Sequence, residues 1–215
     1  MKNILVCFLT LVVIGSGISA SFADIYISGS LGAVILNDSD IDEGPINGKF
    51  TFDTGPGFLL AIGSSVETGG RISTQNRGRS SDKSYARLEA ELGYRKNDVD
   101  KIKIDGLGSG SVDGDFSSVS LMGNLIYDFA TEGYFTPYIG AGAGVANVKA
   151  DTDDSNSEND TVLAGQFILG ASVAANESLT VDFQYRYFAT DDPEFDGLDA
   201  EYSTHNLMIG LRHIF

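Results

Sequence analysis

The stretch ARLEAELGYR, residues 86–95, shows the clearest alternation of apolar and charged residues in this chain. Successive side chains of an extended strand point to opposite faces, so every second residue shares a face. One face of the stretch carries the apolar residues Ala86, Leu88, Ala90, Leu92 and Tyr94. The other face carries the charged residues Arg87, Glu89, Glu91 and Arg95. The pattern predicts a β-strand that separates an apolar environment from a polar one.

The same period-two alternation recurs along the chain, as expected for strands. Together with the first stretch, it predicts strands over 25–36, 50–66, 85–95, 116–129, 136–149, 162–174, 179–188 and 204–215. Most of these segments are close to the ~9 to 11 residues that a tilted strand needs to cross a bilayer. No long helical pattern competes with them, so the sequence predicts an all-β chain.

Alternation alone does not say which face points inward. A soluble barrel of the lipocalin kind turns its apolar face inward, whereas an outer-membrane barrel turns that face toward lipid. The polar face carries small residues such as Ser118, Ser120 and Gly140, which suit a crowded lumen. This observation favours the membrane barrel.

The connections and the aromatic residues favour the same orientation. The connections at 37–49, 96–115, 150–161 and 189–203 are long and acidic, whereas those at 130–135 and 175–178 are short. Long outer loops and short periplasmic turns are typical of membrane barrels. Aromatic residues near the strand ends predict two interfacial girdles, made of Tyr127, Phe129, Phe135, Tyr138 and Phe215 on the turn side and of Tyr94 and Tyr187 on the loop side.

The charged rows determine the register of the strands. A basic side chain that faces lipid at the midplane costs about 2 to 4 kcal/mol, so a slip by one residue is strongly unfavourable. We therefore predict that eight charged residues face the lumen, where opposite charges pair. They are Arg87, Arg95, Arg186 and Arg212 against Glu89, Glu91, Asp128 and Asp182.

The sequence at the N-terminus predicts that the chain is exported from the cytoplasm. Met1 and Lys2 precede the apolar run ILVCFLTLVVI at 4–14, which is shorter than the ~20 residues of a membrane helix. We expect cleavage after Ala23, which gives a signal peptide at 1–23 and one barrel domain at 24–215. The only cysteine, Cys7, lies in the signal, so the mature chain is expected to form no disulfide.

Composition excludes one class of partner. Residues 24–215 hold 13 Lys and Arg against 30 Asp and Glu, a formal charge of 13 minus 30, or −17. A chain this acidic repels the phosphate backbone of nucleic acid. We therefore expect no nucleic acid partner.

The chain ends on HNLMIGLRHIF, residues 205–215, which alternates up to its last residue. Four places resemble the small eight-stranded outer-membrane barrels of the porin, OmpX-like and opacity-antigen type: LEAELGYR at 88–95, TPYIGAGAG at 136–144, IYISGSLGA at 25–33 and the terminal strand. In such proteins the last strand is a sorting signal for the assembly machinery of the outer membrane. The resemblance implies that role for Gly210, His213 and Phe215.

The connection at 67–84 departs from that family because it is far longer than the usual turn. It contains the basic residues Arg71, Arg77, Arg79 and Lys83. We interpret it as a solvated insertion, with contact to anionic periplasmic material as the alternative.

Two motifs are typical of cofactor or metal sites but fit strands and loops better. In GAGAG at 140–144, the pattern continues as a strand, whereas a dinucleotide site needs a helix there. In DTDDSNSENDTV at 151–162, Asn156 and Val162 replace the Gly and Glu of an EF-hand. Two histidines and no mature cysteine make a zinc site hard to assemble. We expect no cofactor and no metal.

An enzyme and a pore are two other functions that the sequence supports only weakly. Ser203 and His205 share a strand face at roughly 6 to 7 Å, with Glu201 nearby, a weak pattern for a lipid-A-modifying hydrolase. Side chains just fill an eight-stranded barrel, which argues against a wide pore.

The sequence thus predicts an eight-stranded antiparallel up-and-down transmembrane β-barrel in a bacterial outer membrane, preceded by a cleavable signal peptide. Both termini are expected in the periplasm because the strand number is even. The expected function is non-enzymatic display of four acidic extracellular loops, in surface-antigen, adhesion or envelope-stabilising roles. The alternatives are a small porin or ion-conducting channel and, less favoured, the hydrolase. Expected partners are outer-membrane lipid and lipopolysaccharide, the assembly machinery, and host or matrix surface molecules.

Overall fold

The computed structural model describes residues 24–37, 39–43, 46–70, 83–104, 108–110, 114–152, 157–191, 194–195, 198–199 and 202–215. The predicted signal peptide at 1–23, with its cleavage site after Ala23, lies outside the described residues. Within those residues, no helix has the length and hydropathy needed to span a membrane.

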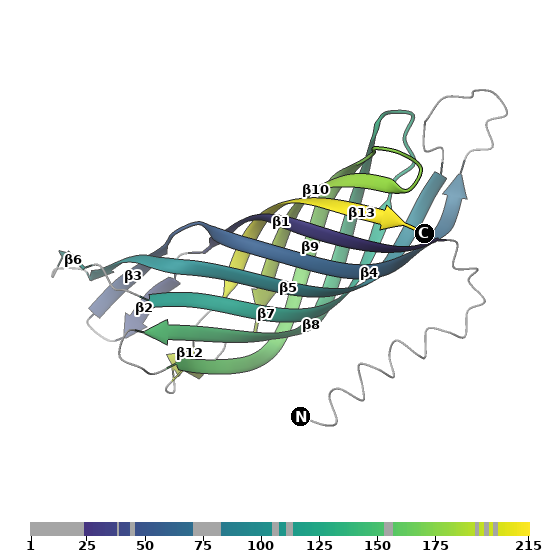
Figure 1. Cartoon of the computed structure of the whole chain (residues 1–215). Coiled ribbons are helices and arrows are strands. Elements are labelled where there is room, and N and C mark those ends of the chain that lie inside the picture. The colour runs from purple at the N-terminus through teal and green to yellow at the C-terminus, as the bar shows by residue number, and fades with distance from the viewer. Residues whose placement is uncertain are drawn as a thin grey trace.

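Eight long strands of the described chain form the wall of a closed barrel (Figure 1). They are β1 (Asp24–Leu36), β4 (Gly55–Gly70), β5 (Lys83–Ile104), β7 (Gly114–Asp128), β8 (Phe135–Thr152), β9 (Ser157–Ala174), β10 (Leu179–Thr190) and β13 (Ser203–Ile214). Each pairs antiparallel with its neighbours, and β13 closes the barrel on β1, with Tyr26 opposite Ile214 and Leu36 opposite Thr204. The predicted eight-stranded up-and-down barrel is confirmed.

The two ends of the barrel differ. The turn end holds the short connections at 129–134 and 175–178 and the C-terminus, and the loop end lies opposite. At one of the short turns, the side-chain oxygen Oδ1 of Asn176 accepts hydrogen bonds from the backbone N–H groups of Ser178 and Leu179. Such an Asx turn reverses the chain in few residues.

Five short strands lie among the described residues of the longer connections. They are β2 (Ser39–Glu43), β3 (Ile46–Phe52), β6 (Gly108–Gly110), β11 (Glu194–Phe195) and β12 (Leu198–Asp199). β3 pairs with the extension of β5 beyond Arg95, and β6 pairs with the same extension. Figure 1 shows β2, β3, β6 and β12 at the end away from the C-terminus. The barrel wall therefore continues past the loop end.

This extension corrects one strand and two connections expected from sequence. The stretch at 50–66 is not one strand, because Asp53 and Thr54 lie outside any strand and separate β3 from β4. The connections at 37–49 and 96–115 are not plain loops, because their backbones pair with one another through β3 and β5. Outside lipid, both faces of a strand can be polar, and the residue pattern then specifies its pairing only weakly, so the sequence carried little signal for these pairings.

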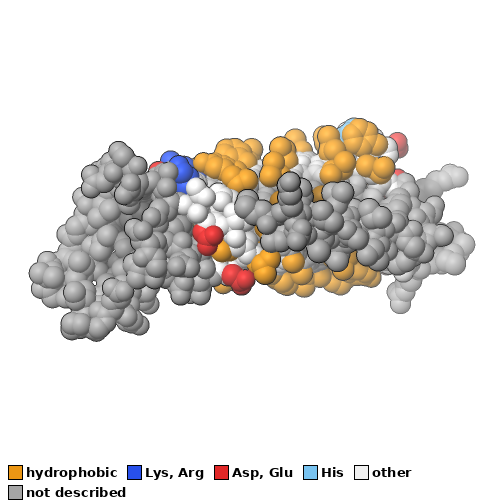
Figure 2. All heavy atoms as spheres, turned by 90° about the horizontal axis from the view of Figure 1, so that it is seen from below, with side chains coloured by type: hydrophobic (Ala, Val, Ile, Leu, Met, Phe, Trp, Pro, Cys, Tyr) orange, Lys and Arg blue, Asp and Glu red, His pale blue; other side chains and the backbone are white. Residues whose placement is uncertain are grey.

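The outward face of the wall is apolar. On β5, Leu88 and Leu92 are 56% and 51% exposed, whereas Arg87 and Arg95 are 3% and 0% exposed. In Figure 2, hydrophobic side chains cover much of the described wall, and the Lys and Arg side chains in view lie at one end of this band. The orientation predicted from the pattern, apolar side chains outward, is confirmed.

The aromatic residues follow the prediction with one exception. Tyr127, Phe129 and Phe135 point outward near the turn end. Tyr138 was expected in the same girdle, but it is 1% exposed and lies inside the barrel with Ile126 and Ile168. It shares its strand face with Gly140, which places both side-chain positions in the lumen.

The hairpin of β4 and β5 extends beyond the other turns. Lys83 Nζ lies 2.8 Å from Glu67 Oε2, and Thr68 Oγ1 donates a hydrogen bond to the carbonyl oxygen of Ser84. The neighbouring carboxylate of Glu67 raises the pKa of Lys83 above its usual value. The other basic residues of the insertion, Arg71, Arg77 and Arg79, lie outside the described residues.

Candidate functional site

The lumen gathers the charged residues that the sequence singled out. All eight are among the buried polar residues, and all point inward from β5, β7, β10 and β13. Buried charges require partners, because removing an ion from water costs several kcal/mol. The lumen can therefore be described by how each charge is paired.

Near the turn end, Arg87 lies between two carboxylates. Its Nε and Nη2 donate to both oxygens of Asp128, at 2.7 and 2.9 Å, and its Nη1 donates to Glu89 Oε1 at 3.1 Å. Two parallel bonds of this kind are the strong geometry for an arginine and a carboxylate. Tyr26 Oη donates to the same Glu89 oxygen at 2.7 Å, which ties β1 to β5 across the interior.

A second pair closes this layer. Arg212 Nη2 donates to Asp182 Oδ1 at 3.1 Å, and its guanidinium carbon lies 5.5 Å from the ring centre of Tyr26. The guanidinium of Arg87 lies 4.7 Å from the ring centre of Tyr138. Arg212 Nε and Tyr138 Oη have no hydrogen-bond partner in the described chain.

In the middle of the lumen, Glu91 of β5 bonds to side chains of three other strands. It accepts hydrogen bonds from Arg186 Nη1 and Asn124 Nδ2 at one oxygen, and from Gln166 Nε2 at the other. Gln166 also donates to Asn124 Oδ1 at 2.7 Å. Because its acceptors and donors are matched, this network holds β5, β7, β9 and β10 in one register.

The glycines of GAGAG make room for this network. A Cβ on Gly142 would lie 2.0 Å from Asn124 Oδ1 and 3.1 Å from Gln166 Cγ. A Cβ on Gly144 would lie 2.0 Å from the backbone oxygen of Leu121. The motif lies within β8, so its glycines serve close packing between strands.

Arg95 differs from the other three arginines. It was expected to pair with an acid, but no carboxylate of the described chain lies within ion-pair distance of it. Its Nε donates to Asn206 Oδ1 and its Nη1 to Ser120 Oγ, both at 3.0 Å, while Nη2 has no partner. Its guanidinium carbon lies 4.0 Å from the ring centre of Phe188. The expected pairing is therefore wrong at this position.

An apolar cluster covers Arg95 toward the loop end. Its buried members are Leu36, Met122, Ala146, Val148, Ala164, Phe188 and Tyr202. Tyr202 Oη and Ser118 Oγ form a hydrogen bond of 3.1 Å within it. We name these residues the apolar cap, which is a buried cluster inside the described barrel.

The two described residues of the hydrolase hypothesis, Ser203 and His205, bond to other side chains. Ser203 Oγ accepts a hydrogen bond from Asn37 Nδ2, and His205 Nδ1 lies 2.7 Å from Tyr185 Oη. Ser203 and His205 share no hydrogen bond, and Glu201 lies outside the described residues. Among the described residues, no three His, Cys, Asp or Glu gather as a metal site.

The three residues of the predicted sorting signal point in different directions. Gly210 faces the lumen, where a Cβ would lie 2.3 Å from Ser30 Oγ. His213 and Phe215 point outward, with ring centres 4.9 Å apart in an edge-to-face arrangement. The backbone N–H of Phe215 donates to Ile25, so the last residue is bonded to the first strand.

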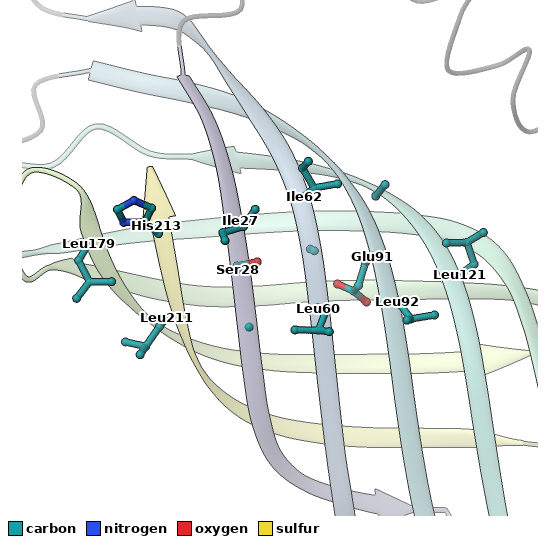
Figure 3. Close-up of a pocket in the computed structure, with 13 residues that line it drawn as sticks. Ile27, Ser28, Leu60, Ile62, Glu91, Leu92, Leu121, Leu179, Leu211 and His213 are labelled. Atoms are coloured by element: carbon teal, nitrogen blue, oxygen red, sulfur yellow. The ribbon is translucent and has the colours of Figure 1, made fainter. Parts of the chain in front are cut away.

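The described lipid-facing wall is hollowed in more than one place, and the groove across β1 and its neighbours is shown in Figure 3. A shallow groove of about 610 Å³ crosses β13, β1, β4, β5 and β7, and Figure 3 shows His213 and Ile27 toward one side of it and Leu121 at the other. Small outward residues such as Gly29 and Ala90 form part of its lining. The groove is apolar, like the rest of the outer face.

The alternation pattern was read for charged residues, and several uncharged lumen residues were not predicted. Asn124, Gln166, Asn206 and Tyr26 complete the networks around the predicted charges. Each lies on the inward face of its strand, so its position in the alternation was the signal that could have found it.

Comparisons with known proteins agree with this architecture. A family model described as outer membrane protein beta-barrel domain matches residues 5–215. The outer membrane protein PagN of Salmonella typhimurium is 26% identical over 251 residues, which cover 100% of both chains. The structure of Neisserial surface protein A is 18% identical, with a TM-score of 0.52, and the match covers 89% of this chain and 97% of that one. The outer membrane protein OprG of Pseudomonas aeruginosa is 16% identical, with a TM-score of 0.50, and covers 89% and 95%.

Proposed function

Because this chain belongs to the outer membrane protein beta-barrel family, we propose that it is a non-enzymatic display protein of the bacterial outer membrane. The barrel anchors four acidic loops outside the cell, where they contact host or matrix surfaces or stabilise the envelope. In this proposal, residues 1–23 are the cleaved signal peptide and residues 24–215 form the barrel domain.

The observation that carries this proposal is the contrast between a filled lumen and an extended loop end. Charged layers and the apolar cap occupy the described interior. This arrangement gives no support to the hypothesis that solutes pass through the barrel. At the loop end, β5 runs for 22 residues, about twice what a membrane strand requires. This chain therefore differs from a minimal barrel in the part of its strands and connections that extends beyond the bilayer.

The charge of the loops supports an outward, solvated role. The connections at 37–49, 96–115, 150–161 and 189–203 contain 20 of the 30 acidic residues and four lysines. We name these four connections the acidic crown. The acidic crown repels other anionic surfaces and attracts divalent cations that bridge to the phosphates of neighbouring lipopolysaccharide. It also favours basic patches on a host or matrix partner.

Orientation is the first part to test. The mature chain is expected to lack cysteine, so single cysteines report their side of the membrane without background. Asn159→Cys near the loop end should react with a membrane-impermeant maleimide on intact cells, and Glu132→Cys at a turn should react only after the outer membrane is opened. The reverse labelling would overturn the proposed topology.

The display role is tested by neutralising the crown. Asp→Asn and Glu→Gln changes in the four connections should leave the heat-modifiable mobility of the folded barrel unchanged while reducing surface adhesion or envelope resistance to chelators. Unchanged adhesion and unchanged resistance in that variant would overturn the proposal.

Two further measurements test the alternative functions. Planar-bilayer conductance of the purified protein would support the pore, and loss of a lipid-A acyl chain that depends on Ser203 would support the enzyme.

The C-terminal strand is proposed to recruit the assembly machinery. The outward, adjacent rings of His213 and Phe215 support this, since they form an accessible aromatic pair at the end of the last strand. Deleting Phe215 should lower the amount of folded barrel in cells while leaving refolding in detergent intact. Equal assembly in cells would contradict the role.

A further inference from the structure

We propose that the outward-facing cluster of Tyr185, Tyr187 and His205 binds a phosphate group of the outer-leaflet glycolipid. The inference deepens the proposed function, because it rests on the loop end facing outside. The cluster lies on β10 and β13, on the lipid side of the wall, and it is separate from the lumen networks.

The three rings form one preorganised group. Tyr187 stands directly opposite His205 across the strand pair, and their ring centres lie 5.2 Å apart. The ring centre of Tyr185 lies 5.9 Å from that of His205, with an angle of 28° between the ring planes. Tyr185 Oη and His205 Nδ1 share a hydrogen bond of 2.7 Å. The imidazole is therefore held in a fixed orientation by its neighbours.

That arrangement leaves two polar groups available. When Tyr185 donates to Nδ1, the neutral imidazole carries its proton on Nε2, which becomes a hydrogen-bond donor. Among the described residues, neither His205 Nε2 nor Tyr187 Oη has a hydrogen-bond partner. Both side chains are half-buried and lie next to exposed apolar residues such as Leu207. Two donors on a lipid-facing wall match an anionic oxygen ligand carried by a lipid.

The height of the cluster identifies the source of that ligand. His205 and Phe215 lie ten positions apart on one face of the last strand. At about 3.3 Å per residue and a tilt of about 40°, this separation spans about 25 Å, the height of the apolar band of a membrane barrel. Since Phe215 lies at the turn end, His205 lies at the opposite interface. In an outer membrane with the proposed topology, lipid phosphates and sugars occupy that level.

The experiment uses the two histidines of the chain as paired reporters. The full barrel, labelled with ¹⁵N-histidine, is refolded into neutral phosphatidylcholine nanodiscs and titrated with bisphosphorylated lipid A. We expect the Nε2 resonance of His205 to shift and that of His213, at the other end of the same strand face, to stay unchanged. A shift of both, or of neither, would overturn the site.

Two further arms identify the ligand. Dephosphorylated lipid A and inorganic phosphate at matched concentration should each leave His205 unshifted. An equal shift with dephosphorylated lipid A would overturn phosphate recognition, and an equal shift with inorganic phosphate would overturn the lipid source.

Matched variants test the contact itself. Tyr187→Phe removes one donor and keeps the ring, so it should weaken the lipid A response about tenfold, as expected for a hydrogen bond to a charged group. Tyr94→Phe makes the same change on β5 near the loop end and should have no effect. Equal effects of both variants would overturn the assignment.

The outcome is separable from that of the proposed function. The barrel with neutralised loops should still show the His205 shift. Reversed cysteine labelling would remove the topology on which both proposals rest. Absence of the shift in a correctly oriented barrel would count against this site alone.

Discussion

Arg87 and Arg95 lie on the same face of the same strand, eight positions apart, and both are almost fully buried. Arg87 is held by two carboxylates, whereas Arg95 is held by an amide oxygen, a hydroxyl and the face of Phe188. The turn end of the lumen is thus an ionic network, and the loop end is a cation under an apolar cap. A buried charge in this barrel is therefore not always part of an ion pair.

The physical consequence is an unequal dependence on each arginine. Removing one partner from a buried ionic group leaves the remaining charges uncompensated, which is far more costly than losing the pair as a whole. Arg87 leaves two acids behind, and Arg95 leaves none. Weakly hydrated guanidinium groups also stack well on aromatic rings, which suits the Arg95 site.

The largest expected effect is that of Arg87→Leu. It should lower the free energy of unfolding by about 3 to 5 kcal/mol, because the buried Glu89 and Asp128 lose the cation that is bonded to both of them. Arg95→Leu, the matched change at the loop end, should alter it by less than about 1 kcal/mol. Denaturant unfolding in phospholipid vesicles, followed by heat-modifiable mobility, measures both. Equal losses would show that the two arginines stabilise the barrel in the same way, whatever their partners.

The next effect concerns the room around the Glu91 network. Gly142→Ala places a methyl group against Asn124 and should cost about 1 to 3 kcal/mol through overpacking. Gly123→Ala on the neighbouring strand points outward, where the nearest atom to a Cβ is the oxygen of Ala143 at 3.8 Å, so it should change stability by less than about 0.5 kcal/mol. Unfolding midpoints of the two variants test the contrast. Similar values would mean that the lumen can relax around Gly142.

A smaller effect measures how the ring stabilises Arg95. A double-mutant cycle with Arg95→Leu and Phe188→Leu should give a coupling energy of about 0.5 to 2 kcal/mol for the cation–π contact. The four unfolding free energies supply the value. A coupling near zero would show that the amide and hydroxyl bonds alone hold the guanidinium.

The smallest effect is expected for the exposed ion pair at the turn end. Lys83 and Glu67 lie as close as the buried pairs, but both side chains are solvated, and such pairs contribute little. Lys83→Gln should leave the unfolding midpoint unchanged within experimental error. A loss comparable to that of Arg87→Leu would show that distance, not burial, governs these pairs.

The sequence predicted the wall of this barrel well because lipid imposes a strict pattern on it. Each charged residue in ARLEAELGYR would be costly on the outer face, so alternation determined both the strand and its facing. Where the strands leave lipid, that constraint ends, and the pairing of β3 with the extension of β5 went unpredicted. Nearness to a strand end does not decide which way Tyr138 faces, whereas the strand face that it shares with Gly140 does.

The partners of each lumen charge were harder to predict than its burial. Arg87 and Asp128 belong to adjacent strands, so alternation and strand order together bring them close. Arg95 and Asn206 are 111 positions apart and meet across the interior. Their encounter depends on the stagger of the closed barrel, which no local pattern of residues encodes. The charge balance of the lumen was therefore predictable in total but not in its distribution.

The uneven pairing of the lumen charges gives the barrel a lengthwise electrostatic polarity. The Arg87 group, with two carboxylates, carries an excess negative charge toward the turns, and Arg95 leaves an excess positive charge toward the loops. The positive end of this internal dipole thus lies toward the loop end of the barrel, and its negative end lies toward the turns.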